Sequence, residues 1–274
     1  MKNLLIRSIT GLVFVAIILG SLFLGKFSYA IVFAAVLTGG LIEFYSLFKG
    51  KNYYPCKICG YITGLAAFIL AFLCTADILP EEWIFSIFPL LLITFISGLY
   101  SKKENPVGSM AITVLSLIYI ALPISLINLL VFPSFDDAVQ FMPDIFIAVL
   151  AIIWIYDSGA YLFGISFGKH RLFERISPKK SWEGAIGGAL IAIASSWPIS
   201  LFISEISFPH WIILSFLIVV SATFGDLTES LIKRSVGVKD SGDLFPGHGG
   251  ILDRFDSLLF AVPVVVLYLK LFIE

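Results

Sequence analysis

Residues 145–166 read IFIAVLAIIWIYDSGAYLFGIS, a stretch whose one charged side chain is Asp157. An α-helix needs about 20 consecutive apolar residues to cross the roughly 30 Å hydrocarbon core of a membrane. A strand of a membrane barrel would instead alternate apolar and polar side chains over about ten residues. Because this stretch is continuously apolar, it predicts a transmembrane helix.

Similar stretches recur along the whole chain of 274 residues. Hydrophobic residues make up 59% of the sequence and charged residues 14%, and the mean hydropathy is +1.00. About 25% of residues are charged in an ordinary soluble domain. The predicted fold class is therefore all-α, a polytopic integral membrane protein. We expect about nine spans, at residues 9–25, 29–48, 58–76, 83–100, 111–132, 145–166, 184–203, 210–228 and 257–273.

Basic residues indicate how these helices are oriented. With a cytoplasmic N-terminus, every Lys and Arg except Lys26 and Lys270 falls on the inner side, as the positive-inside rule requires. An odd number of spans then leaves the C-terminus outside. The basic inner face suits anionic lipid headgroups or nucleotide phosphates, although lysines that only set the topology would give the same pattern.

The two halves of the chain differ in their loops. Residues 1–140 have short loops and predict a bundle of about five helices, a scaffold for dimerisation or lipid access. Residues 141–274 predict a catalytic region of about four helices, with two cytoplasmic loops that carry the polar sites. No internal repeat, low-complexity tract or soluble domain stands out, and no nucleic-acid partner is expected.

The three cysteines predict neither a metal site nor a disulfide. Cys56 and Cys59 form a CxxC pair on the inner side, and Cys74 lies far away in a span. A structural zinc site normally has four ligands. Thiols that face the cytoplasm are kept reduced, so we expect no disulfide between Cys56 and Cys59.

The first polar loop begins inside a span, at Asp157. This residue lies about twelve residues into its helix, or about 18 Å deep. A carboxylate at that depth is costly, and it favours a functional role over a purely structural ion pair. Farther along, Ser177, Lys179 and Lys180 precede the next helix and suggest a cradle for a triphosphate, although a solvated loop would look similar.

Glycines flank this cationic segment on both sides. Gly164 and Gly168 lie four residues apart, as do Gly184 and Gly188. Small residues at this spacing allow two helices to approach closely. We therefore expect these glycines to serve helix packing.

The second polar loop, residues 230–256, reads SLIKRSVGVKDSGDLFPGHGGILDRFD. Around its start, Asp226, Glu229, Ser230 and Lys233 share one helix face by their spacing. The glycines beside His248 permit a close backbone approach, so their amides could bind an anion. For His248 itself, an ordering hydrogen bond is favoured over a role as general base.

Three carboxylates in this region, Asp226, Asp253 and Asp256, supply the hard oxygen ligands that Mg²⁺ prefers when it also binds phosphate. Acidic and basic side chains in one loop indicate metal-assisted phosphoryl chemistry. The alternative interpretation is a web of salt bridges that only orders the loop.

The same run resembles the signature of the phosphatidate cytidylyltransferase, or CDP-diacylglycerol synthase, family. The shared positions are the Ser-x-x-Lys-Arg opening from Ser230, the Lys239-Asp240 pair, the Pro-x-His-Gly-Gly segment from Pro246 and Asp253-Arg254-x-Asp256. Upstream, the segments Ser177-Pro178-Lys179-Lys180 and Glu183-Gly184 are similar to the family's nucleotide-binding stretch. Residues 1–140 match the family only in being hydrophobic.

The resemblance implies a reaction in which CTP and phosphatidic acid give CDP-diacylglycerol and pyrophosphate at the inner membrane surface. It also implies an all-helical homodimer with a polar cavity open to cytoplasm and lipid. The aspartates that match Asp226 and Asp253 would hold a metal centre, with K⁺ accompanying Mg²⁺. A bacterial inner membrane is the expected location.

Motif positions and chemistry together nominate three groups of residues. The predicted catalytic residues are Asp226, Asp253, Lys239 and His248. The predicted residues for CTP and phosphate are Asp157, Ser177, Lys179, Lys180, Glu183, Lys233, Arg234, Asp240, Gly249, Gly250 and Arg254. The predicted metal ligands are Asp226, Asp253 and Asp256.

Two other functions remain open. A CTP-dependent lipid kinase would transfer the γ-phosphoryl group, but the Asp253-Arg254-x-Asp256 signature argues against it. A transporter for an anionic solute would use Asp157 and the basic inner face as its pathway. Against a transporter, the polar residues gather at one surface, and the two halves show no paired interrupted helices.

Overall fold

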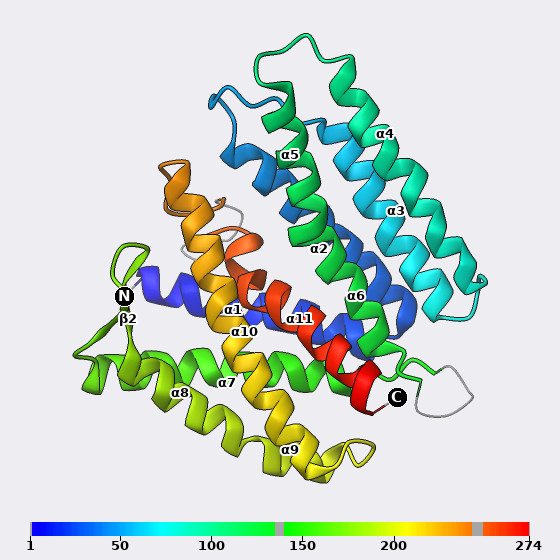
Figure 1. The fold of residues 1–274 in the computed structure, drawn as a ribbon. Coiled ribbons are helices and arrows are strands. Elements are labelled where there is room, and N and C mark those ends of the chain that lie inside the picture. Colours follow the sequence, from blue (N-terminus) through cyan, green and yellow to red (C-terminus); the bar gives the residue numbers. More distant parts are fainter. Residues whose placement is uncertain (1, 135–139, 243–248, 274) are drawn as a thin grey trace.

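The structure is a computed structural model that describes residues 2–134, 140–242 and 249–273, with side chains from residue 9 onward. It confirms the all-α fold class (Figure 1). The first half comprises α1 (Lys2–Phe23), α2 (Lys26–Leu47), α3 (Lys57–Thr75), the 3-10 helix η1 (Glu81–Ser86), α4 (Ile87–Leu99), α5 (Pro106–Ser116), the π-helical turn η2 (Leu117–Ala121) and α6 (Leu122–Val131).

The second half contains the longest helices and a small hairpin. Its elements are α7 (Asp144–Phe167), β1 (Arg171–Phe173), β2 (Ser177–Ser181), α8 (Trp182–Ala194), α9 (Ser196–Phe202), α10 (Phe208–Ser235) and α11 (Leu252–Phe272). The two strands pair antiparallel, with Arg171 opposite Ser181 and Phe173 opposite Ser177. This hairpin lies in the first polar loop, where the sequence indicated no strand.

Within the described residues, eight helical segments are long and apolar enough to cross a membrane. They are Lys26–Leu47, Lys57–Thr75, Glu81–Leu99, Pro106–Val131, Asp144–Phe167, Trp182–Phe202, Phe208–Ser235 and Leu252–Phe272. The remaining expected span corresponds to α1, whose apolar part Ile9–Phe23 is shorter. The orientation of the two termini stays a prediction.

Local signals explain where several of these helices begin and end. The Asn105 side chain accepts a hydrogen bond from the Gly108 amide at 3.0 Å and caps α5. The Ser181 hydroxyl caps α8 in the same way, through the Gly184 amide at 3.2 Å. After α10, Gly237 adopts a φ of 77°, a conformation that ends helices at little cost only for glycine.

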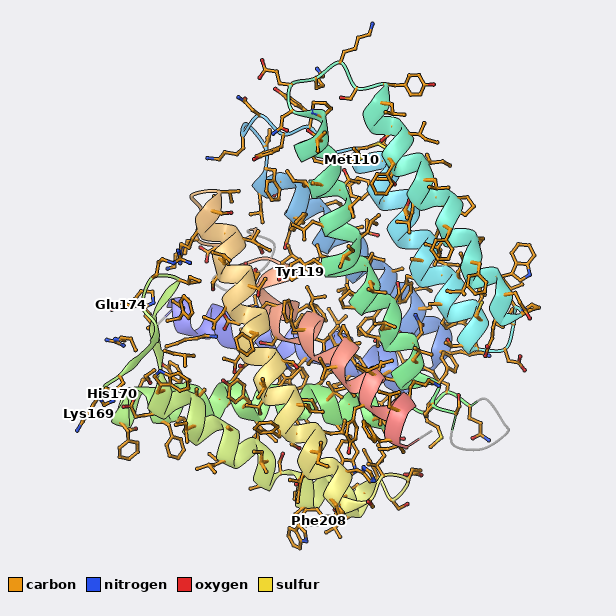
Figure 2. The ribbon with its side chains drawn as sticks, viewed as in Figure 1. Met110, Tyr119, Lys169, His170, Glu174 and Phe208 are labelled. Carbon is orange, nitrogen blue, oxygen red and sulfur yellow. A yellow bond between two sulfur atoms is a disulfide. The ribbon has the colours of Figure 1, made fainter. Side chains whose placement is uncertain are left out.

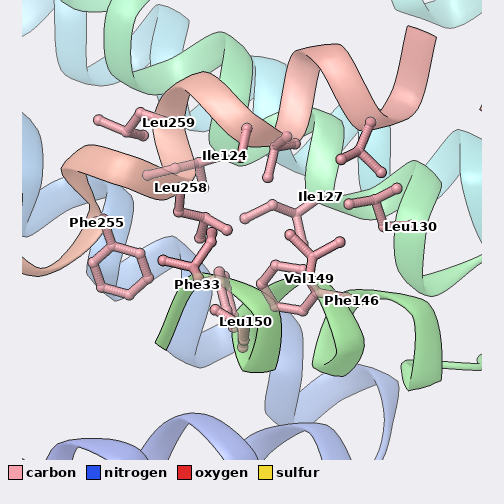
Figure 3. Packing of buried hydrophobic residues seen from close by; sticks show 14 of the residues in the cluster. Phe33, Ile124, Ile127, Leu130, Phe146, Val149, Leu150, Phe255, Leu258 and Leu259 are labelled. Atoms are coloured by element: carbon pink, nitrogen blue, oxygen red, sulfur yellow. The ribbon is translucent and has the colours of Figure 1, made fainter. Parts of the chain in front are cut away.

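One hydrophobic core joins the two halves. Phe33 of α2, Ile127 of α6 and Phe146 of α7 are fully or almost fully buried, and they meet Leu258 of α11 (Figure 3). The Phe33 and Phe146 rings pack edge to face with centroids 5.5 Å apart. The last helix is thereby fixed against helices from both halves, although the proposed division at residue 140 stays a prediction.

The glycines of the first polar loop serve helix packing, as predicted. A Cβ atom added to Gly188 of α8 would lie 2.7 Å from the Ala160 nitrogen of α7, and one added to Gly159 would lie 3.0 Å from the Gly188 Cα. A Cβ on Gly184 would lie 3.1 Å from the Gly164 Cα. The backbones of α7 and α8 therefore touch along their length, which only small residues allow.

The prediction for the cysteine pair was wrong. The structure joins Cys56 and Cys59 in a disulfide at the start of α3, whereas Cys74 is a free thiol. Cys56 occupies the N-cap position without a side-chain capping bond, Cys59 lies in the first turn, and their Cα atoms are 5.3 Å apart. This separation is within the range that a disulfide bridges, and the argument from compartment did not take this proximity into account.

Candidate active site

The two polar loops meet around one cavity of about 560 Å³, which we call the polar cavity. Elements α7, β2, α8, α10 and α11 all contribute to its lining. Six of the predicted site residues line it, namely Asp157, Lys179, Lys180, Asp226, Asp253 and Asp256. The structure therefore brings together carboxylates and ammonium groups that lie up to about a hundred residues apart in the sequence.

An ion pair links the first loop to the second. The Lys180 ammonium of β2 contacts the Asp226 carboxylate of α10, and both side chains are 29% exposed. The other Asp226 oxygen accepts a hydrogen bond from the Ser230 hydroxyl at 3.3 Å, one helical turn later. Because solvent reaches both partners, another cation or anion can compete for this pair.

A second ionic group lies deeper, where Lys233 contacts two carboxylates. Its ammonium donates to Glu229 at 2.6 Å and to Asp253 at 2.5 Å, and all three side chains are at least nine-tenths buried. Glu229 and Lys233 lie one turn apart on α10, and Asp253 lies in the first turn of α11. Lys233 thus ties the end of α10 to the beginning of α11.

Asp253 also accepts bonds from the second loop. Its Oδ2 atom accepts the Ser241 amide at 3.0 Å, the Ser241 hydroxyl at 2.7 Å and the Gly250 amide at 2.8 Å. Gly249 has a φ of 80°, and a side chain there would collide with the Asp253 carboxylate. Both carboxylate oxygens of Asp253 are therefore bound by groups of the protein.

A smaller cavity of about 210 Å³ lies between α1, α7 and α11. Apolar side chains such as Phe14 and Trp154 line most of it. It shares Asp157, Asp253 and Asp256 with the polar cavity and adds Arg254. The three aspartates thus line both a cavity with the cations Lys179 and Lys180 and a smaller cavity lined mostly by apolar side chains.

Glu183 lies outside both cavities and holds the hairpin. Its carboxylate accepts the Lys169 and His170 amides at 3.1 and 3.2 Å, and it pairs with the His170 ring at 2.6 Å. Figure 2 shows Lys169 and His170 at the outer end of α7 and the hairpin. The predicted contact of Glu183 with substrate stays a prediction.

The remaining predicted residues are placed as follows. Ser177 lies at the start of β2, and Lys239 and Asp240 are exposed beyond α10. Arg234 is exposed and donates to the Val238 carbonyl at 2.9 Å. His248 lies outside the described residues.

The sequence did not single out Glu43 or Tyr119. Glu43 of α2 accepts hydrogen bonds from the second loop, and its signal was a charge inside an apolar span. The Tyr119 ring of η2 packs on Phe260 of α11 with centroids 6.2 Å apart, and Figure 2 shows it in the middle of the molecule. The hydroxyl of Tyr119 and Oε1 of Glu229 are buried without a hydrogen-bond partner among the described residues.

The carboxylates of the polar cavity are the kind of donor that a divalent cation needs. Carboxylate oxygens of Asp226, Asp253 and Asp256 line one cavity and have the chemistry that Mg²⁺ selects. Within the described part of the chain, however, no three His, Cys, Asp or Glu side chains are already grouped to hold a metal ion. The chemistry fits, but Mg²⁺ would have to displace the Lys180 ammonium to use both oxygens of Asp226. At Asp253 it would share oxygens that already accept bonds from Lys233, Ser241 and Gly250.

The sequence of this chain is similar to known cytidylyltransferases. It matches the model described as "Cytidylyltransferase family" over residues 5–272. A phosphatidate cytidylyltransferase of Staphylococcus saprophyticus is 31% identical over 278 residues, which cover 95% of this chain and 96% of the relative.

Two shorter matches are closer in sequence. Phosphatidate cytidylyltransferases of Haemophilus influenzae and Staphylococcus epidermidis are 48% identical over 120 residues and 47% identical over 116 residues. Each match covers 42% of this chain, and it spans 42% or 44% of the relative's length. The family match is longer and runs from the first helix to the last, so it includes both loops at the polar cavity, and the chain belongs to the cytidylyltransferase family.

Proposed function

We propose that the protein transfers the cytidylyl group of CTP to phosphatidic acid, giving CDP-diacylglycerol and pyrophosphate. One observation carries the proposal within this family: the same three aspartates line both the polar cavity, which also has three cationic side chains, and the smaller cavity, whose side chains are mostly apolar. The polar cavity, with Lys179 and Lys180, suits the phosphates of a nucleotide. The apolar one, between α1, α7 and α11, suits a lipid. The carboxylates stand where the two substrates would meet.

The proposed reaction is a substitution at phosphorus. An oxygen of the lipid phosphate attacks the α-phosphorus of CTP, and the bond from that phosphorus to the pyrophosphate oxygen breaks. Both reactants are anions, and negative charge grows on the leaving pyrophosphate. Positioning and charge neutralisation therefore supply most of the catalysis. The lipid phosphate is already ionised near neutral pH, so no strong base is needed.

Cations of the first loop are suited to bind the triphosphate. Lys179 and Lys180 line the polar cavity, as does Arg171 of β1. Lys180 contacts Asp226, so an incoming phosphate competes with that carboxylate for the ammonium. Arg234, Lys239, Asp240 and Arg254 are proposed to contact substrate from the second loop. The Gly249 amide and the His248 side chain are proposed to complete this contact. The Gly250 amide is proposed to join them by exchanging its bond to Asp253 for one to substrate.

A magnesium ion belongs to the proposal as well. We propose Asp226, Asp253 and Asp256 as its ligands, with K⁺ as an accompanying cation. When bound, Mg²⁺ would neutralise charge on the phosphate oxygens. The Lys233 ammonium pairs with the Asp253 carboxylate, holds it in place and contributes a buried positive charge.

The protein is an integral membrane protein by its apolar helices, and the relatives named above are bacterial. We propose that it lies in a bacterial inner membrane with the polar cavity facing the cytoplasm, where CTP is available. We further propose that it acts as a homodimer, as the family resemblance implies.

The function is tested with purified protein in detergent, phosphatidic acid, Mg²⁺ and CTP labelled at either the α- or the γ-phosphorus. Label that enters the lipid from the α-position alone supports cytidylyl transfer. Label from the γ-position alone would mean a lipid kinase. Absence of label in folded protein would favour a transporter for an anionic solute.

Replacing Lys180 by Ala is expected to raise the KM for CTP about tenfold or more, because a hydrogen bond to a charged group contributes about 1.5–3 kcal/mol. The measurement is the CTP dependence of α-label transfer. Lys102 is a matched control, since it is exposed in the loop before α5 and lines neither cavity. An unchanged KM for CTP with an altered KM for phosphatidic acid would assign Lys180 to the lipid.

A further inference from the structure

Glu43 is a carboxylate inside the apolar helix α2. It is 9% exposed, and its neighbours Leu41 and Phe44 are fully buried. Moving a carboxylate out of water costs several kcal/mol of folding free energy. Hydrogen bonds or a nearby cation must compensate this cost. No Lys or Arg in the described ranges forms an ion pair with Glu43. Hydrogen bonds must therefore supply the compensation.

All loop partners of Glu43 come from the second polar loop. Its Oε1 atom accepts the Ile251 amide at 2.8 Å, and its Oε2 atom accepts the Leu252 amide at 3.0 Å. These amides belong to the N-cap and first residue of α11, where helical N–H groups lack partners within the helix. A negative charge at this end is also favoured by the helix dipole. Glu43 thus caps α11 from another helix.

The same carboxylate is connected to Asp253. The Ser241 hydroxyl lies 3.2 Å from the Glu43 Oε2 atom and 2.7 Å from the Asp253 Oδ2 atom. A hydroxyl has one proton, so the Ser241 hydroxyl lies between the two carboxylates and donates to one of them at a time. Asp253 follows directly after Leu252, so Glu43 fixes the backbone that carries Asp253 and one of its hydrogen-bond donors.

Small residues on both sides allow this close approach. A Cβ atom on Gly242 would lie 2.8 Å from the Glu43 Oε1 atom, and one on Gly250 would collide with the same carboxylate. In the opposite direction, a Cβ on Gly39 of α2 would collide with the Ile251 side chain. Gly242 and Gly250 therefore leave room for the Glu43 side chain, and Gly39 leaves room for the Ile251 side chain.

From these contacts we propose that Glu43 is a positioning residue that holds Asp253 and the start of α11 in the geometry needed for reaction. The proposal rests on the proposed function of Asp253 and adds that α2, in the first half of the chain, completes the active site. Glu43 touches no substrate in this assignment. It acts through the amides of residues 251 and 252 and through Ser241.

The decisive variant is Glu43→Gln, which keeps the side-chain size but replaces one acceptor oxygen by an NH₂ group. That NH₂ group would face an amide or hydroxyl donor. The cap of α11 would then lose one hydrogen bond, and two donor groups would repel each other. We expect kcat for α-label transfer to fall at least about tenfold, as for loss of a bond to a charged group, while the KM for CTP stays within about twofold. A kcat within twofold of the unchanged protein would overturn the proposal.

Two further variants separate positioning from a general loss of stability. Thr38→Val on the same helix removes a bond that stays within α2, from the Thr38 hydroxyl to the Ala34 carbonyl, and should leave kcat unchanged. Gly242→Ala leaves Glu43 intact but pushes on its carboxylate, so it should lower kcat in the same way as Glu43→Gln. If Thr38→Val lowers kcat as much as Glu43→Gln does, the effect is one of helix stability and the proposal fails.

Hydrogen exchange gives a readout that does not depend on activity. In Glu43→Gln, peptides that cover residues 249–256 should exchange at least about tenfold faster, because their local opening becomes easier. Peptides from α7 and α8 should be unchanged. If the unchanged protein transfers no label, the proposed function fails. Faster exchange confined to residues 249–256 in Glu43→Gln would still support the proposal that Glu43 positions this segment. Unchanged exchange in residues 249–256 would contradict the proposal that Glu43 positions this segment.

Discussion

Replacing Asp253 by Asn is expected to reduce cytidylyl transfer by about a thousandfold, the scale seen when one preorganised charged or polar group is removed from an active site. The substitution removes a negative charge from the polar cavity and places an NH₂ group against donors. These donors are Lys233 on one oxygen and the Ser241 and Gly250 groups on the other. The measurement is kcat for α-label transfer in purified, folded protein.

Asp144→Asn is the matched control for this prediction. Asp144 is an exposed aspartate in the first turn of α7, 13 residues before Asp157. It lines neither cavity, so its loss should change kcat by less than about twofold, as for most surface substitutions. Near-normal Mg²⁺-dependent activity in Asp253→Asn would show that Asp253 is not part of the catalytic centre.

The second large effect is expected on stability. Replacing Lys233 by Met leaves Glu229 and Asp253 buried without their shared cation, which typically costs about 3–5 kcal/mol. The side chains of Lys233 and Glu229 are only 9% and 4% exposed, so solvent cannot replace the lost charge. The Tm in detergent should fall clearly, and α-label transfer should be lost at temperatures where the protein is still folded.

A double variant tests this explanation. Adding Glu229→Gln to Lys233→Met removes one of the two uncompensated charges, so it should restore part of the lost stability but not the activity. Lys49→Met, at an exposed position after α2, should leave the Tm unchanged. If the double variant is less stable than Lys233→Met alone, unbalanced charge is not the cause of the destabilisation.

The positions of the helices could be predicted because continuous apolarity is a local signal. The ends were less accurate wherever a helix continues into polar sequence. The span predicted at 210–228 belongs to a helix that runs to Ser235, and the span predicted from 257 begins at Leu252. In both cases the polar extension is fixed by ion pairs such as Lys233 to Glu229 and Asp253. Hydropathy alone does not detect such pairs.

The sequence could predict which residues form the candidate site, but not which residues of distant segments contact one another there. Spacing on a helix placed Glu229 and Lys233 on one face, and the structure pairs them. The pairing of Lys180 with Asp226 joins distant segments, which no local pattern encodes. Glu43 had a local signal as a charge inside an apolar span, but its partner Ile251 lies 208 residues later, so no local pattern shows what it contacts. The roles assigned to the individual site residues stay predictions.

The cap that Glu43 provides for α11 has a consequence for how the chain is made. Ribosomes synthesise the N-terminal helices first, so α2 enters the membrane before the amides of Ile251 and Leu252 exist. At about 5–20 residues per second, roughly 10–40 s separate the two segments. Throughout that interval the carboxylate must remain at the water boundary or find a temporary donor. The Glu43 carboxylate thus receives these two amide donors only after the chain has been made as far as the last helix.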